Sequence, residues 1–283
     1  MISDVLRNKI DEYSPKDTLE QDNVLQEIMQ HYILASLSRS GIFSDVIFHG
    51  GTCLRIISGT NRYSEDLDFL VKVPDSEFRW QKYLDKVGED CAREGIDFEL
   101  IDKSEAETVV QKAFLKTDSI GKILSLNLPF DRRREKKIKI KLEIDTNPPA
   151  GSDYKTSYIT FPTISPLTTQ TLESGFANKA HALLCRSYIK GRDWYDFIWY
   201  VSNKIKPNFI LLQNAIYQQG PWAGKSVIVT DKWFKVSLEN VVNEIDWNIA
   251  KQDIMRFLPH YEQRGIQEWS ADFFLYLIRN MKY

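Results

Sequence analysis

The sequence predicts an α/β or α+β protein: a mixed sheet forms an N-terminal core, and a helical C-terminal part follows it. Short apolar runs at 45–48, 66–71 and 96–101 alternate with helical patterns. Residues 137–145 alternate between apolar and charged side chains, which is the period of a half-buried strand. From residue 173 onward, apolar residues recur mostly at helical spacing. Strands first and helices later indicate one sheet-containing core with helices added.

The elements follow in chain order. Apolar residues at three- and four-residue spacings predict a helix over 18–40, and Gly41 follows its end. The other predicted elements are a strand over 45–48, a short helix over 53–58, a strand over 66–71, a helix over 76–94, strands over 96–101, 120–128 and 137–146, an irregular connection over 147–172, and a helical stretch over 173–202. We expect a core domain over 1–165 and a helical domain over 166–283 that contributes to the active site.

Composition excludes several classes of protein. The 37 Lys and Arg residues nearly balance the 39 Asp and Glu residues, so the whole surface is not a polycation. A local basic strip at 132–141 holds seven Lys and Arg residues against one Glu, and fits either a phosphate backbone or a solvated hairpin tip. No apolar segment approaches the roughly 18 residues of a membrane span, and no secretory signal is visible. We expect a cytoplasmic protein with no membrane partner.

The most informative stretch runs from 48 to 69, where a strand, a Gly-Gly-Thr turn, a short helix and an acidic strand follow one another. Gly50 and Gly51 allow backbone amides to approach a phosphate chain, and Thr52 adds a hydroxyl donor. Asp66 and Asp68 are two apart on a strand, so both side chains leave the same face. Such a pair can bind one or two Mg²⁺ ions, although either motif alone is commonplace.

A third acid is expected beside this pair. Along residues 137–145 the isoleucines and Leu142 take the buried face, while Lys139, Lys141, Glu143 and Asp145 take the other. Glu143 or Asp145 could complete a metal-binding triad, and the sequence does not choose between them. A half-solvated strand with alternating charges is the competing interpretation.

Further charged residues gather near the start of the helical part. Lys179 and Arg186 are seven apart, share a helix face, and could both reach nucleotide phosphates. Asp193 or Asp196 could orient a cation or take up a proton. Taken alone, this pattern also fits a surface helix with ordinary ion pairs.

Together these motifs resemble a known family. The segment 48–55 (Phe-His-Gly-Gly-Thr-Cys-Leu-Arg), the segment 62–69 (Arg-Tyr-Ser-Glu-Asp-Leu-Asp-Phe) and the segment from Lys179 to Asp196 are similar to the AbiEii/MenT-type nucleotidyltransferase toxins. These toxins belong to type IV toxin–antitoxin and abortive-infection systems, within the DNA polymerase β-like nucleotidyltransferase superfamily. Cys53 stands where members typically carry Ser.

The resemblance implies a site and a reaction. Gly50, Gly51 and Thr52 occupy the nucleotide-phosphate loop, with Lys179 and Arg186 as further nucleotide-binding residues. Asp66 and Asp68 occupy the metal-binding pair, with Glu143 or Asp145 as the third acid. Lys179 and Asp196, or Asp193 in place of the latter, match the late essential residues. The implied reaction transfers a nucleotide from an NTP to an acceptor, with Mg²⁺ or Mn²⁺.

The resemblance also implies partners. The acceptor can be a tRNA 3′ end or another RNA, and a winged-helix antitoxin is usually encoded nearby. Two alternatives stay open: transfer to a hydroxyl of a protein or small molecule, and a non-catalytic nucleotide-binding protein that acts by interaction.

Overall fold

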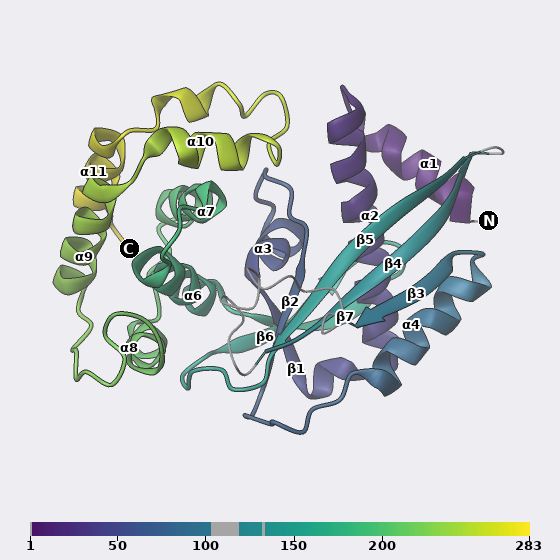
Figure 1. The fold of residues 1–283 in the computed structure, drawn as a ribbon, viewed down its shortest axis with the longest axis horizontal. Helices are drawn as coiled ribbons and strands as arrows, with labels where there is room; N and C mark the ends of the chain where they lie inside the picture. The colour runs from purple at the N-terminus through teal and green to yellow at the C-terminus, as the bar shows by residue number, and fades with distance from the viewer. Residues whose placement is uncertain (1, 103–118, 132–133) are drawn as a thin grey trace. The chain divides into compact units, whose positions relative to one another are not determined.

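Among the described residues, the five predicted strands and two further strands pair into one mixed sheet, and this confirms the predicted fold class. A computed structural model describes residues 2–102, 119–131 and 134–283 (Figure 1). The strand order is β3-β4-β5-β2-β1-β7-β6. β2 is antiparallel to β1 and parallel to β5, so the sheet is mixed at its centre. The strands are β1 (Val46–His49), β2 (Leu67–Val71), β3 (Asp97–Asp102), β4 (Ser119–Asp131), β5 (Arg134–Asp145), β6 (Tyr154–Ile159) and β7 (Ser165–Gln170).

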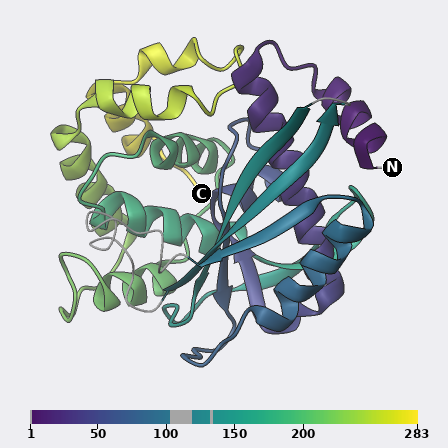
Figure 2. The same cartoon turned by 45° about the vertical axis from the view of Figure 1, so that its right-hand side comes forward.

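Two helices cover one face of this sheet, α2 (Thr18–Ser40) and α4 (Gln81–Arg93), as Figures 1 and 2 show. α2 begins after Asp17, whose carboxylate accepts the backbone N–H of Glu20 at 2.8 Å, and ends at Gly41 in the left-handed conformation. Its residues from 24 to 37 are almost all buried, because it packs against both the sheet and α4. α1 (Ile2–Tyr13) packs on α2, where the Tyr13 hydroxyl donates to Glu27 at 2.8 Å.

Strand periodicity decides which residues enter the core. Leu67, Phe69 and Val71 of β2 point to the helix-covered face together with Leu142 and Ile144 of β5. The residues between them point to the opposite face. Side-chain burial is described from Ile138 onward, and from there to Asp145 buried residues alternate with exposed or half-buried ones, as the sequence predicted.

The expected irregular connection over 147–172 is wrong, because this segment contains β6 and β7. Its four prolines suggested a loop, since proline cannot donate to a strand ladder. The sheet accommodates them by position. Pro166 lies at the start of β7, away from Thr169, where β7 pairs with Phe48 of β1. β6 is an edge strand with mostly exposed side chains.

The helical part is also more divided than predicted, because the stretch 173–202 forms two helices. The chain is extended at Arg186, and a new helix begins at Gly191. A Cβ on Gly191 would lie about 2.0 Å from the carbonyl oxygen of Ala250, so glycine allows the two helices to touch. The helices are α6 (Leu172–Cys185), α7 (Gly191–Ser202), α8 (Phe209–Gln218), α9 (Asp231–Glu244), α10 (Trp247–Met255) and α11 (Ala271–Arg279).

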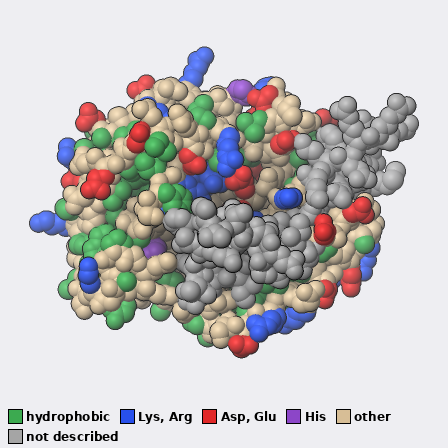
Figure 3. Space-filling model, in the orientation of Figure 1, with side chains coloured by type: hydrophobic (Ala, Val, Ile, Leu, Met, Phe, Trp, Pro, Cys, Tyr) green, Lys and Arg blue, Asp and Glu red, His purple; other side chains and the backbone are tan. Residues whose placement is uncertain are grey.

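Contacts divide the chain into two compact units. The sheet unit comprises residues 1–59, 63–148 and 156–169, and the helical unit comprises 60–62, 149–155 and 170–283. An aromatic cluster in the helical unit brings together Trp194, Phe197, Trp247 and Phe274, with Trp247 and Phe274 stacked at 4.2 Å between ring centroids. Acidic and basic side chains are interspersed over the visible surface (Figure 3). None of the described helices is long and apolar enough to cross a membrane.

Candidate active site

The Gly-Gly-Thr segment is the first turn of a helix, α3 (Gly50–Ser58), which begins three residues earlier than predicted. Gly50 has φ +80°, and a Cβ at this position would overlap the carboxylate of Asp68. His49 is the register partner of Asp68 in the adjacent strand. Glycine therefore allows the start of α3 to lie directly against Asp68. The first-turn amides of a helix have no intrahelical partners and can bind an anion beside this carboxylate.

Thr52 connects this helix to the acidic strand. Its side chain is fully buried, and its hydroxyl donates to the backbone carbonyl of Asp66. A hydroxyl has one proton to donate, so this proton is not available to a phosphate in the same arrangement. The structure thus shows Thr52 fixing the backbone of Asp66. The amides of Gly50 and Gly51 are better suited to contact a phosphate.

All four predicted metal-binding carboxylates leave the same face of the sheet. Asp66 and Asp68 lie two residues apart, and the parallel register of β2 and β5 places Glu143 beside Asp68 and Asp145 beside Leu70. This face is opposite to the one that α2 and α4 cover. All four side chains are half-buried. Periodicity had indicated only that the acids within each strand share a face. The register of β2 and β5 now places the two strands' acids on one surface.

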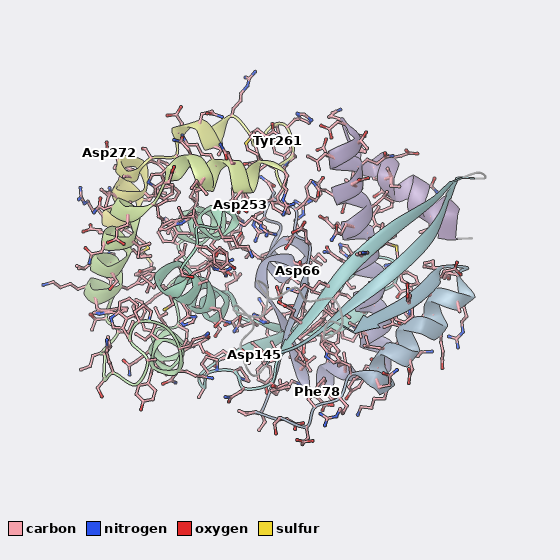
Figure 4. The ribbon with its side chains drawn as sticks, in the orientation of Figure 1. Asp66, Phe78, Asp145, Asp253, Tyr261 and Asp272 are labelled. Carbon is pink, nitrogen blue, oxygen red and sulfur yellow. The ribbon has the colours of Figure 1, made fainter. Side chains whose placement is uncertain are left out.

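The register also distinguishes the two candidates for the third acid. Glu143 is the direct neighbour of Asp68, and its carboxylate lies 2.5 Å from Lys141 Nζ. Asp145 lies further along β5, apart from Asp66 in Figure 4, and accepts the backbone N–H of Asn147 at 3.1 Å. By position, Glu143 is the better third acid. Both stay predictions as metal ligands.

The carboxylates fit a magnesium ion of the kind that nucleotides carry. Among the described residues, no three His, Cys, Asp or Glu side chains lie close enough together to form a complete cage. Mg²⁺ does not need one, because it commonly takes one or two carboxylates and completes its shell with waters and substrate phosphates. Asp66 and Asp68 beside the start of α3 match that requirement.

In the helical unit, Lys179 lies in a buried network of ion pairs. Its Nζ is 2.7 Å from Asp193 Oδ1 and 2.8 Å from Asp196 Oδ2. Asp196 is fully buried and also accepts two hydrogen bonds of 2.6 Å from Arg62. Arg186 Nε lies 3.2 Å from Asp193 Oδ2. The structure thus brings together every residue predicted from this part of the chain.

Arg62 is the residue that sequence reasoning missed. It stands in the quoted motif Arg-Tyr-Ser-Glu-Asp-Leu-Asp, but no role was assigned to it. Its side chain is only 2% exposed, and its two-pronged contact fixes both oxygens of Asp196. Arg62 follows the turn residues Thr60 and Asn61 and precedes the acidic strand. This local sequence does not indicate that its side chain is buried.

These contacts favour the charged forms of Asp193, Asp196 and Lys179. Burial alone would raise the pKa of Asp193 and of Asp196, yet the cations that face them hold both below the usual range. For Lys179, burial opposes the charge, but the two carboxylates raise its pKa. All three groups therefore stay charged at neutral pH. Asp196 has no exposed surface, so it acts by holding Lys179 and Arg62 and not by touching substrate.

The predicted residues therefore fall into two sets. The sheet unit carries Gly50, Gly51, Thr52 and the four carboxylates, and the helical unit carries Lys179, Arg186, Asp193 and Asp196. The basic strip at 132–141 lies partly outside the described residues. Within it, side-chain burial is described only from Ile138 onward.

Comparison with known proteins finds one matching family and similar folds. Residues 32–275 match the family described as "Nucleotidyl transferase AbiEii toxin, Type IV TA system". The fold is similar to that of JHP933 from Helicobacter pylori, with a TM-score of 0.50 and 15% identity over 92% of this chain and 89% of that one. Another H. pylori protein, described as a candidate nucleotidyltransferase, gives 0.49 and 15% over 90% and 89%. No curated protein matches the sequence.

Proposed function

Because the chain belongs to the AbiEii nucleotidyl transferase toxin family of type IV toxin–antitoxin systems, we propose that it transfers a nucleotide from an NTP to the 3′ end of tRNA. The observation that carries the proposal is the contact between Gly50 and Asp68, which sets helix amides against a carboxylate. A nucleotide and a divalent cation require this combination of donors and acceptors. The reaction depends on Mg²⁺ or Mn²⁺.

The chemistry assigns a task to each group. The acceptor hydroxyl oxygen forms a bond to the α-phosphorus of the NTP, and the bond to the leaving pyrophosphate breaks. The hydroxyl proton passes to a carboxylate among Asp66, Asp68 and the third acid. A divalent cation, when bound, neutralises charge on the phosphates. The amides of Gly50 and Gly51 bind phosphate oxygens, and Lys179 and Arg186 offset the remaining negative charge.

The partners follow from the same proposal. The basic strip at 132–141 is suited to the phosphate backbone of an RNA acceptor. As a type IV toxin, the protein acts opposite an antitoxin, which we propose to be a winged-helix protein encoded nearby. The protein acts in the cytoplasm, where NTPs and tRNA are both available.

The direct test is incubation of the purified chain with each of the four radiolabelled NTPs and total tRNA, with Mg²⁺ or Mn²⁺. We expect label on tRNA with at least one NTP. Asp66→Ala abolishes the transfer, whereas Asp85→Ala, which changes an exposed acid on α4, leaves it intact. Label on protein or on a small molecule, and none on tRNA, overturns the acceptor. Absence of transfer to any of these acceptors overturns the proposed reaction.

A further inference from the structure

Lys190 is a lysine that no role in the proposed reaction uses. It immediately precedes Gly191, the first residue of α7. Its side chain is half-buried, and among the described residues its ammonium has neither an ion pair nor a hydrogen bond. An ammonium that loses water without gaining a partner is unfavourable. The position therefore needs an explanation beyond packing.

The surroundings of Lys190 make its charge less favourable still. It interacts repulsively with Arg192, Arg186 and Lys179, while Asp193 favours its charged form. Asp193 is already engaged by Lys179 and Arg186. Burial, and then these cations, lower the pKa of Lys190 to about 8.

The cluster around Lys190 contains more positive than negative charge. Five cationic side chains (Arg62, Lys179, Arg186, Lys190 and Arg192) accompany two buried carboxylates, Asp193 and Asp196. Asp253 of α10 lies at the margin, where it accepts the backbone N–H of Arg192 at 3.4 Å. Even with Asp253 included, two positive charges remain unbalanced. This surplus is built into the helical unit and not spread over a solvated surface.

The cations are also held in place. The Arg192 guanidinium carbon lies 4.0 Å from the centroid of the Phe257 ring, and that of Arg186 lies 4.8 Å from the centroid of Tyr188. Aromatic faces and Asp193 orient the guanidinium groups without neutralising the cluster. Fixed cations around an unpaired ammonium form a preorganised site for an anion with several charges.

We propose that Lys190 binds the phosphate chain of the nucleotide and takes up a proton as it does so. The proposal rests on the proposed nucleotidyl transfer and extends it, because it gives the cluster the triphosphate as its ligand. A bound phosphate supplies the negative charge that would balance the cations around Lys190, which Asp193 alone does not balance. It also raises the affinity of the Lys190 amine for a proton.

The test is titration calorimetry of the full chain at pH 8 with inorganic tripolyphosphate and Mg²⁺, in two buffers that differ in ionisation enthalpy. With a pKa of about 8, we expect wild type to take up about half a proton per ligand bound. Lys190→Arg keeps the affinity but loses the uptake, because arginine is always protonated. Lys190→Met weakens binding about tenfold or more. Lys232→Met changes an exposed lysine of α9 and leaves both quantities unchanged.

Three results would overturn the inference: no binding of tripolyphosphate, equal affinity in Lys190→Met, or proton uptake that persists in Lys190→Arg. A parallel titration with a short single-stranded RNA without a 5′ triphosphate separates the two sources of phosphate. Uptake linked to Lys190 with RNA alone also overturns it. If the chain labels tRNA but shows no proton uptake linked to Lys190, only the inference is disproved. If the uptake occurs but label appears on another acceptor and not on tRNA, only the proposed acceptor is disproved.

Discussion

The carboxylates of the two polar clusters differ in their burial and in their pairing with cations. In the sheet unit, four half-buried acids share one face of β2 and β5. In the helical unit, Asp193 and Asp196 are buried and closely paired with Lys179, Arg62 and Arg186. Like charges gathered on one face favour a bound cation, whereas buried pairs need each partner to remain in place. We infer that the first set serves a ligand and the second set holds cationic side chains in position.

The largest expected effect is on activity in the sheet unit. Asp66→Asn keeps the size of the side chain but removes a negative charge that we propose as a metal ligand. We expect label transfer to fall by about 10³-fold or more, since several kcal/mol of charge stabilisation is lost. The midpoint of urea unfolding should stay unchanged or rise, because repulsion among the acids decreases. A loss of stability equal to the loss of activity would show that Asp66 is a structural residue.

The next effect is on stability in the helical unit. Arg62→Met leaves Asp196 without its two-pronged partner in a fully buried position. Removing one member of a buried pair typically costs about 3–5 kcal/mol of unfolding free energy. Urea denaturation measures this loss. The double variant Arg62→Met/Asp196→Leu should lose less than the sum of the single variants, and strict additivity would contradict the direct pairing.

A matched pair of glycines tests the contact that carries the proposed function. Gly50 and Gly59 both have positive φ, but a Cβ meets Asp68 only at Gly50, and at Gly59 it meets open space. Alanine at either position should cost about 1–2 kcal/mol of stability through backbone strain. Only Gly50→Ala should also lower label transfer, by about 10²-fold, because it displaces a carboxylate. Equal activities of the two variants would contradict the role of this contact.

The smallest effect is a pH dependence of stability. The pKa values of Asp193 and Asp196 are depressed in the folded state, so their pairing stabilises the protein above the ordinary aspartate pKa of about 3.9. This contribution is lost as the pH falls below that value. The raised pKa of Lys179 gives the opposite dependence, with stability lost at strongly alkaline pH. Urea midpoints measured from pH 7 down to pH 3 should fall less steeply in Asp196→Asn than in wild type.

Local patterns predicted the sheet core well, because period and turn chemistry act over a few residues. The alternation in 137–145 and the Gly-Gly turn before an acidic strand each correspond to observed elements. The strands over 154–159 and 165–170 were missed. β6 lies at the edge of the sheet with mostly exposed side chains, and the one proline of β7 lies at its start, away from its pairing with β1. No local pattern contains that information.

The roles of the candidate site residues stay predictions, although the structure shows where these residues lie. Residue type and spacing indicated both acid sets and Lys179, and the family comparison confirms the nucleotidyltransferase assignment. Nothing in the local sequence indicated that Arg62 binds Asp196, because 134 positions separate them. It also did not show that the Thr52 hydroxyl is used within the protein. Both facts depend on tertiary contacts that periodicity cannot express.

The most direct measurement compares the unfolding free energies of Asp68→Asn and Asp196→Asn under identical conditions at neutral pH. Both substitutions neutralise one carboxylate with almost no change in volume. We predict that Asp68→Asn is as stable as wild type or more stable, while Asp196→Asn loses several kcal/mol, since Arg62 and Lys179 lose a shared partner. A destabilised Asp68→Asn beside an unaffected Asp196→Asn would contradict the division of roles between the two clusters.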